Sequence, residues 1–286
     1  MDVTVSIVTY NSAEHIGRCV DSILCQKGVR FEVFVIDNFS SDDTLRKLEV
    51  YGSHVQVIRN PQNIGFGRAH NQSLARAKGR FFHALNPDAW LVSDDTHREL
   101  VQSMEESPDA GLMTTHIEGQ QQPPVELLYP GERHLRDPLG PLPGEIAWVL
   151  GANMFARKSC LDVVRGFDES FFLYSEETDL CLRLRKAGYE IECASHLCVG
   201  HVGGASESGS ASRGVWVRKM AGLYLFYSKH YTPRDFKRLL RRDYNRSRFR
   251  LWLASLGLTH SPANENMDKY TAIRDTSREC LSRIHS

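Results

Sequence analysis

The sequence predicts an α/β fold in which a mainly parallel central sheet is flanked by helices. Two observations support this prediction. Apolar, β-branched runs alternate with segments of helical periodicity, and polar residues follow directly after the ends of those runs. Alternating strands and helices imply right-handed crossovers and parallel pairing. Since ligands of such sheets bind outside the carboxyl ends of the strands, the polar residues there are candidates for a binding site.

The first strand is predicted at residues 3–10, a β-branched run typical of a strand buried on both faces. Asn11 and Ser12 end this run, and apolar residues then recur at helical spacing over residues 13–24. Ser12 is a candidate cap for that helix. Residues 31–37 form the second predicted strand, which ends in an acid.

The alternation continues as far as residue 88. Four polar residues at positions 40–43 indicate another helix cap. The elements predicted after it are a helix at 44–51, a strand at 55–59, a helix at 67–78 and a strand at 80–85 that ends at Asn86-Pro87-Asp88.

The second part of the chain is less regular. A predicted helix at 96–107 is followed by residues 117–144, which hold six prolines and few periodic apolar positions. Loops of this length are commonly functional or disordered. Regular structure is expected again at 146–157, followed by helices at 178–187 and 215–230.

These elements suggest how the chain is divided. We expect a catalytic domain at residues 1–210, with a nucleotide-binding half at about 1–95 and an acceptor-binding half at about 96–210. Residues 211–286 are expected to form a C-terminal helical extension.

Composition excludes several other classes of protein. The chain has 286 residues, and its 35 basic and 35 acidic side chains cancel, which argues against nucleic acid as a partner. No apolar run approaches the roughly 20 residues that a membrane-spanning helix needs, and the N-terminus reads as a strand rather than a signal peptide. Seven scattered cysteines are expected to be reduced thiols in a cytoplasmic protein.

The familiar phosphate-binding loops are missing from the sequence. No G-x-x-x-x-G-K-[ST] motif is present, and no G-x-G-x-x-G follows the first strand. Residues 63–67 contain glycines, but they follow the third strand and have a different spacing. A divalent cation is the expected substitute for such a loop.

Seven motifs in a fixed order resemble the family 2 glycosyltransferases of the glycosyltransferase A fold, especially their bacterial rhamnosyltransferase-like branch. The resemblance covers residues 3–206, and its motifs are Val5-Ser6-Ile7-Val8-Thr9-Tyr10-Asn11, Val35-Ile36-Asp37-Asn38, Asn63-Ile64-Gly65-Phe66, Asn86-Pro87-Asp88, Gly151-Ala152, Phe172-Leu173-Tyr174-Ser175-Glu176-Glu177-Thr178-Asp179-Leu180 and His201-Val202-Gly203-Gly204-Ala205-Ser206.

The first two motifs are expected to bind the nucleotide. Asp37 can accept a hydrogen bond from the imide N–H of a pyrimidine, and the resemblance implies the same role. Thr9, Tyr10 and Asn11 would bracket the ring and the ribose. Asn38 is a further candidate, with a role in the turn equally open.

The third motif is expected to lie beside the ribose and the diphosphate. Glycines there let the backbone approach a ligand closely, and the following helix offers free N–H groups. Arg68 is interpreted as a solvated helical side chain rather than a phosphate ligand. The donor candidates in this segment are Asn63, Gly65, Phe66 and Asn71, the last being equally compatible with a structural role.

Asp88 is the candidate metal ligand, since Mg²⁺ and Mn²⁺ favour carboxylate oxygens together with substrate phosphates. The family commonly has two aspartates at this strand end, whereas this chain has Asn86 and Asp88. By resemblance His201 can supply a second ligand, although a lone histidine is more often structural.

The acidic cluster at residues 176–179 is expected to hold the catalytic base. Acids at a helix start are favoured by the helix dipole, but three acids in four positions exceed what capping needs. Glu177 aligns with the family's base, where aspartate is commoner, and Glu176 is the alternative. Asp179 is expected to orient a neighbour or brace the loop.

The acceptor site is expected to include Trp148, Gly151, Ala152 and Phe172. By resemblance, Trp148 and Gly151-Ala152 shape the floor of the pocket, and Trp148 is the preferred acceptor contact. Phe172 can stack on a sugar ring or pack in the core. The irregular segment 117–144 carries no readable acceptor code.

Residues 234–252 are basic and contain interleaved aromatic residues. Such a stretch can lie on anionic lipid, which would suit a cytoplasmic enzyme at the inner face of the cell membrane. A solvated helix packed by its apolar side is an equal alternative.

The resemblance implies an inverting glycosyltransferase that uses Mg²⁺ or Mn²⁺. The expected donor is dTDP-rhamnose, with UDP-sugars as alternatives, and the expected acceptor is a hydroxyl of a glycan or lipid-linked glycan in bacterial cell-surface polysaccharide synthesis. A catalytically inactive nucleotide-sugar-binding or scaffold protein of the same fold is the alternative, since Asn86 replaces an acid.

Overall fold

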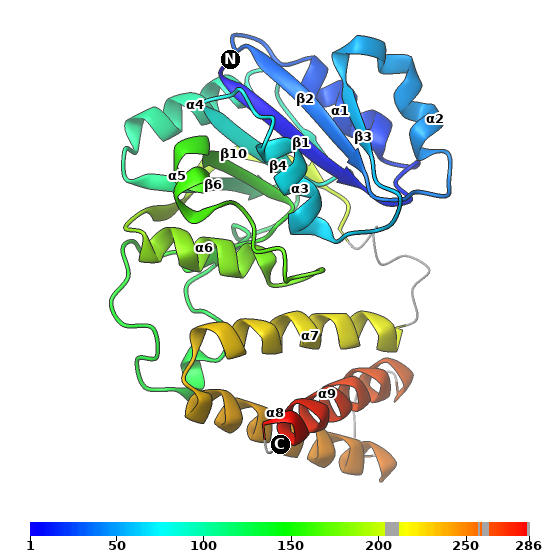
Figure 1. Ribbon diagram of the computed structural model, residues 1–286, viewed down its shortest axis with the longest axis vertical. Coiled ribbons are helices and arrows are strands. Elements are labelled where there is room, and N and C mark those ends of the chain that lie inside the picture. The colour runs from blue at the N-terminus through cyan, green and yellow to red at the C-terminus, as the bar shows by residue number, and fades with distance from the viewer. Residues whose placement is uncertain (204–211, 257, 259–262, 285–286) are drawn as a thin grey trace. The chain divides into compact units, whose positions relative to one another are not determined.

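The computed structural model describes residues 1–203, 212–256, 258 and 263–284 (Figure 1). Its strands are β1 (Val3–Thr9), β2 (Phe31–Asp37), β3 (Gln56–Arg59), β4 (Phe81–Leu85), β5 (Ala89–Leu91), β6 (Ala110–Ile117), β7 (Val125–Glu126), β8 (Trp148–Val149), β9 (Asn153–Arg157) and β10 (Glu190–His201). Its helices are α1 (Ile16–Leu24), α2 (Thr44–Leu48), α3 (Phe66–Leu74), α4 (Thr96–Glu106), α5 (Lys158–Val164), α6 (Glu176–Lys186), α7 (Ser212–His230), α8 (Pro233–Ser255) and α9 (Ala263–Arg283). Two short 3₁₀ helices are η1 (Glu49–His54) and η2 (Glu132–His134).

In the part of the chain that is described, eight strands form one sheet in the order β3-β2-β1-β4-β9-β6-β10-β5. The pairs β3–β2, β2–β1, β1–β4 and β6–β10 are parallel, while β9 and β5 are antiparallel to their neighbours. The predicted α/β fold with a mainly parallel sheet is confirmed.

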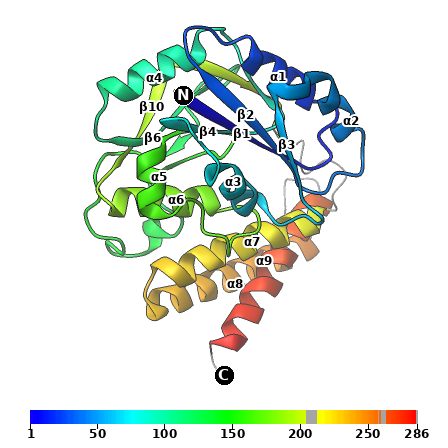
Figure 2. The same ribbon diagram turned by 45° about the horizontal axis from the view of Figure 1, so that its top comes forward.

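Helices cover both faces of this sheet, as the two views show (Figures 1 and 2). On one face the apolar sides of α1 and α4 pack on alternate residues of β1, β2 and β4, among them Val5, Val33 and Phe81. On the other face α3, α5 and α6 pack on the intervening residues, such as Phe34, Phe82 and Met154. Because both faces are buried, the strands read as apolar runs rather than alternating ones.

Several predicted boundaries are corrected. Helix α1 begins at Ile16 rather than at residue 13, and Ser12 is not its cap, because a turn intervenes and His15 takes the cap position. Helix α6 begins at Glu176, before the predicted residue 178. The 117–144 segment is not wholly irregular, since Val125–Glu126 pairs with Trp148–Val149.

The chain divides into two compact units. The first comprises residues 1–129, 142–172 and 176–206, and the second comprises residues 130–141, 173–175 and 207–286. Two segments from the middle of the chain, residues 130–141 and 173–175, therefore belong with the C-terminal helices. The Tyr231 hydroxyl donates to the Pro130 carbonyl (2.6 Å), and Gly222 packs against the Tyr174 backbone so closely that a Cβ would lie 2.2 Å from the Tyr174 oxygen.

Within the second unit, α9 packs along both α7 and α8. None of the described helices combines the length and the apolar content needed to cross a bilayer.

Candidate functional site

Thr9 and Asp37 lie opposite each other at the carboxyl ends of the paired strands β1 and β2. Both are buried, and the Thr9 hydroxyl donates to Asp37 Oδ1 (3.2 Å) while the Ser40 N–H donates to Oδ2 (3.2 Å). These contacts fix the orientation of the carboxylate at the strand end. An Asp37 held in this way can still accept a further hydrogen bond, since each carboxylate oxygen has more than one lone pair.

Asn11 shapes the loop beside this pair. Its backbone has φ of 51°, a left-handed conformation that asparagine tolerates better than most residues. Its Oδ1 accepts from the Ser41 N–H (2.8 Å), and its own N–H donates to the Ser40 hydroxyl. Tyr10, just before it, is 45% exposed and is free to meet a ligand with its ring.

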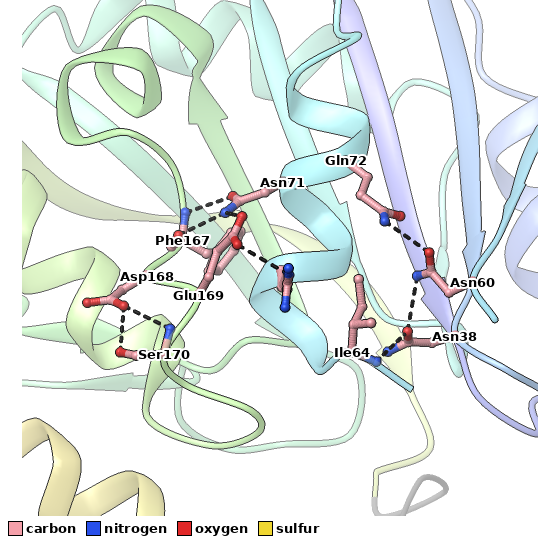
Figure 3. Close-up of polar contacts among 10 residues, drawn as sticks. Asn38, Asn60, Ile64, Asn71, Gln72, Phe167, Asp168, Glu169 and Ser170 are labelled. Carbon is pink, nitrogen blue, oxygen red and sulfur yellow. Dashed lines mark hydrogen bonds and ion pairs between the residues drawn. The ribbon is translucent and has the colours of Figure 1, made fainter. Parts of the chain in front are cut away.

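Asn38 is engaged within the protein (Figure 3). Its amide nitrogen donates to Asn63 Oδ1 (2.9 Å) and to the Gly65 carbonyl (3.1 Å). Its oxygen accepts from Asn60 Nδ2 and from the Ile64 N–H, both at 3.1 Å. These four contacts use the hydrogen-bonding capacity of the Asn38 side-chain amide. Asn38 therefore shapes the loop before α3 instead of offering a free group to the nucleobase.

Gly65 joins this loop to the segment before α6. It has φ of 91°, and a Cβ there would lie 2.5 Å from the carbonyl oxygen of Phe172. The next residue, Phe66, donates its N–H to the same oxygen (2.9 Å). Only glycine fits this position. The contact ties helix α3 to the residues that lead into the acidic cluster at 176–179.

Asn71 makes the second link between these segments (Figure 3). Its side chain donates to the Phe167 carbonyl and accepts from the Phe167 N–H, both at 2.9 Å. Arg68, one turn earlier, pairs with Glu169 at 3.3 Å. In this structure Asn71 therefore braces a loop.

Asp88 and His201 meet where β5 pairs with β10. Ala89 lies opposite His201 in the ladder, and the Val202 N–H donates to the Asp88 carbonyl (3.1 Å). His201 Nε2 consequently lies 3.4 Å from Asp88 Oδ1, and the carboxylate is 4% exposed. Burial acts to raise the pKa of Asp88, but His201 and nearby groups outweigh burial and hold that pKa below its ordinary value.

This pair fits a divalent cation. Asp88 Oδ1 is buried without a well-formed hydrogen bond among the described residues, so its lone pairs are available. Adjacent ligands of an octahedral ion with bonds of about 2.1 Å lie about 3.0 Å apart, close to the observed separation. No group of three histidine, cysteine or acidic side chains that could hold a metal occurs in the described residues, so a bound ion would also need ligands from a substrate diphosphate.

Asn86 and Ala152 connect this pair to the acidic cluster. Asn86 donates its N–H to the Ala152 carbonyl (2.9 Å). The neighbouring Gly151 faces Glu177, and a Cβ on Gly151 would lie 3.6 Å from the Glu177 Cβ. The Asp88 strand end and the start of α6 therefore border the same stretch of backbone.

Glu176 and Glu177 lie in different environments at the start of α6. Glu176 is 4% exposed, and its Oε2 has no hydrogen-bond partner among the described residues. Burial and the nearby Glu177 carboxylate raise the pKa of Glu176 well above its usual range. Glu177 is only half-buried. Two carboxyl groups held in such different surroundings can take separate roles.

Asp179 braces the loop before the cluster. Its Oδ2 accepts from Arg183 Nε (2.7 Å), and Arg183 Nη1 donates to the carbonyls of Val164 and Gly166. Asp179 is 1% exposed, so the ion pair is shielded from water on one side. Through Arg183 it therefore holds the 164–166 turn in place.

The acceptor candidates lie nearby but differ in what they offer. Trp148 is half-buried and donates its indole N–H to the Leu128 carbonyl (3.2 Å). Ala152 is buried, whereas Phe172 is 50% exposed, which leaves its ring open to a ligand. Residues 204–206 of the last sequence motif lie outside the described residues.

Two side chains at the start of α1 were not predicted from the sequence as part of the site. His15 is among the groups that lower the pKa of Asp88. The Arg18 guanidinium, on α1, stacks over the Trp90 ring at 3.3 Å from its centroid. The spacing of three residues between His15 and Arg18 places both on one side of the start of α1. The sequence alone does not indicate their importance, because that depends on the packing of α1 against β5.

The sequence was compared with known families. The description "Glycosyl transferase family 2" matches residues 4–140, and "Glycosyl transferase family group 2" matches residues 88–267. N-acetylglucosaminyl-diphospho-decaprenol L-rhamnosyltransferase of Mycobacterium tuberculosis is 25% identical over 218 residues, which cover 64% of this chain and 70% of that protein. Chondroitin synthase of Pasteurella multocida is 34% identical over 116 residues, but these cover 40% of this chain and only 12% of that protein.

Solved structures share the fold. TarS 1-349 of S. aureus in complex with UDP superposes with a TM-score of 0.58 at 16% identity, covering 98% of this chain and 92% of that one. The mannosyltransferase PcManGT of Pyrobaculum calidifontis, in complex with GDP-Man and Mn²⁺, gives a TM-score of 0.60 at 17% identity, covering 99% and 84%. The fold is that of the glycosyltransferase A structures.

Proposed function

The chain belongs to glycosyl transferase family 2, in its rhamnosyltransferase-like branch, and from this premise we propose that it is a metal-dependent, inverting glycosyltransferase. In this proposal the chain moves a sugar from a nucleoside diphosphate donor onto a hydroxyl of a glycan or lipid-linked glycan.

One arrangement carries the proposal. A buried carboxylate and an imidazole that suit a divalent cation, Asp88 and His201, lie at one strand end, and a half-exposed carboxylate, Glu177, faces Gly151. The hydrogen bond between Asn86 and Ala152 joins the two parts. Transfer with inversion needs both a charge-stabilised leaving group and a base for the attacking hydroxyl.

In the proposed reaction Glu177 accepts the proton of the acceptor hydroxyl, which attacks the anomeric carbon on the face opposite the leaving group. The bond to the diphosphate oxygen breaks, and nucleoside diphosphate leaves. Asp88 and His201 would hold Mg²⁺ or Mn²⁺, which when bound offsets the negative charge of the diphosphate. Burial and the Glu177 carboxylate raise the pKa of Glu176, which favours the protonated form of Glu176, so in this proposal Glu177 and not Glu176 accepts the proton.

The nucleotide would lie against the ends of β1 and β2, where Asp37 is oriented for a pyrimidine imide. Thr9, Tyr10 and Asn11 border that position, and Asn63, Gly65 and Phe66 would border the ribose and diphosphate. Asn38 and Asn71 contribute by shaping the loops, as their contacts indicate.

The mycobacterial relative supports the proposed substrates, because its name specifies an L-rhamnosyl transfer to a diphosphate-linked lipid carrying N-acetylglucosamine. We therefore propose dTDP-rhamnose as the donor and a lipid-linked glycan as the acceptor. All seven cysteines are free thiols, which is consistent with catalysis in the cytoplasm.

The experiment is rhamnose transfer from dTDP-rhamnose to an N-acetylglucosaminyl diphospholipid in the presence of Mn²⁺. We expect Glu177→Gln to lower kcat by roughly 10²- to 10⁴-fold, the range typical of a lost general base, and to leave dTDP binding intact. The exposed Glu105→Gln, on α4, is the matched control and should keep full activity.

Full activity in Glu177→Gln would refute the assignment of the base. If the unmodified chain bound dTDP but turned over no donor, the alternative function, a catalytically inactive nucleotide-sugar-binding protein, would be supported instead. Asn86, which stands where the family commonly has an acid, is the observation that favours this alternative.

A further inference from the structure

The outward side of α8 carries a continuous stripe of exposed side chains. Their spacing of three, four or seven residues places them on one face of the helix. The stripe, called here the α8 outer face, consists of Arg234, Arg238, Arg241, Asn245, Arg248, Phe249, Trp252 and Leu256. The opposite side is buried through Leu239, Leu240 and Ser247, and α9 packs along the helix (Figures 1 and 2).

The α8 outer face is divided along its length. Its first two turns present Arg234, Arg238 and Arg241, whereas its end presents large apolar side chains. Phe249 is 57% exposed, Trp252 55% and Leu256 52%, and the rings of Phe249 and Trp252 lie 5.8 Å apart. An aromatic pair this exposed is costly in water unless something covers it.

Among the described residues, the positive charge at the start of this face is not neutralised. Asp235 is turned to the helix start, where it shares hydrogen bonds with Thr232, and Asp243 lies on the inner side beside Tyr224 and Arg242. Among the described residues, no acid forms an ion pair with Arg234, Arg238 or Arg241. The face therefore offers cations and apolar rings without a compensating carboxylate.

We propose that the α8 outer face docks the protein onto an anionic lipid surface. The three arginines would contact lipid phosphates, and Phe249, Trp252 and Leu256 would enter the boundary between headgroups and acyl chains. Aromatic rings favour this boundary, and each cation near an anionic surface strengthens binding. This lipid-docking face includes none of the residues proposed for catalysis or donor binding. It can therefore be tested separately from the proposed function.

Charge complementarity favours lipid over a second copy of the chain. A two-fold symmetric dimer formed through this face would bring the same surface of both copies together. Whether the two helices ran parallel or antiparallel, neither copy of this face would bring an acid of its described residues to the three arginines. An anionic bilayer supplies phosphates to them.

Co-sedimentation of the full chain with vesicles tests the proposal. We compare phosphatidylcholine vesicles with vesicles in which about one third of the lipid is phosphatidylglycerol, and we expect binding to the anionic vesicles that weakens as salt is raised. Arg234→Gln/Arg238→Gln/Arg241→Gln should weaken this binding roughly 100-fold. The matched control is Lys27→Gln/Arg46→Gln/Arg98→Gln, which removes three exposed cations elsewhere and should change binding less than about threefold.

The apolar end is tested with Phe249→Ser/Trp252→Ser, which should also weaken vesicle binding at least tenfold. All of these side chains are exposed, so the variants should melt as the unmodified chain does, and melting curves verify this. Equal binding to neutral and anionic vesicles, or an equal loss in the control triple variant, would overturn the proposal. So would a dimer in light scattering that Phe249→Ser/Trp252→Ser converts to monomer without any change in vesicle binding.

Discussion

His201 Nε2 lies 3.4 Å from Asp88 Oδ1 because the last residue of β10 pairs with the first residue of β5. The ladder thus brings an imidazole to a carboxylate that is far away in the sequence. Most of the Asp88 side chain is buried, and a buried carboxylate is costly unless hydrogen bonds or a neighbouring positive charge stabilise it. A divalent cation at this pair would supply that charge.

Gly65→Ala should destabilise the fold strongly. The new Cβ would lie 2.5 Å from the Phe172 carbonyl oxygen, and the residue would also have to keep a φ of 91°. We expect a loss of about 2–4 kcal/mol in the free energy of unfolding, measured with urea. Gly119→Ala is the control, because Gly119 has φ of 79° but nothing within 4 Å of its Cβ position, and it should cost about 1 kcal/mol. Equal losses in the two variants would show that the contact with Phe172 is unimportant.

Arg183→Ala should be far more costly than the removal of a similar pair on the surface. It removes the Arg183 guanidinium from Asp179, which is 1% exposed, and it frees the carbonyls of Val164 and Gly166. We expect a loss of about 3–5 kcal/mol in the free energy of unfolding, whereas Lys158→Ala, in an exposed pair with Asp162 at the same spacing, should lose under about 1 kcal/mol. Similar losses would contradict the bracing role of Asp179.

Glu176 should make the fold less stable as pH rises. Its pKa in the folded chain is raised well above that of the unfolded chain, about 4.3, so the folded state retains a proton that the unfolded state has released. This contribution is complete below the unfolded pKa and is lost as pH rises through the folded pKa. Melting temperatures at a series of pH values should therefore fall less steeply in Glu176→Gln than in the unmodified chain. Parallel curves would show that Glu176 is ionised in the fold, and Glu105→Gln should leave the slope unchanged.

The sequence was sufficient for strands β1, β2, β3 and β4 and for their ends, whereas β5, β6 and β10 were not predicted. Residues 3–9 and 31–37 are apolar runs whose pattern a parallel, buried strand requires, so the positions of Thr9 and Asp37 at adjacent strand ends could be predicted. The C-terminal strand β10 was missed, because its register shifts between Ala194 and Cys198 and its residues are mixed in polarity. The partners of Asn38 and Asn71 were also beyond prediction, since they depend on loops brought together only in the folded chain.

The most direct test of the account is the melting temperature of the protein with dTDP or UDP, in the presence and absence of Mn²⁺. A ligand that binds only the folded chain raises the melting temperature. At a hundredfold excess over Kd, such a ligand adds about 2.7 kcal/mol to the free energy of unfolding. We expect a shift that needs both nucleotide and Mn²⁺, that is lost in Asp88→Ala and that persists in Asp162→Ala. No shift with any nucleoside diphosphate, or a shift that Asp88→Ala leaves unchanged, would contradict the donor site proposed here.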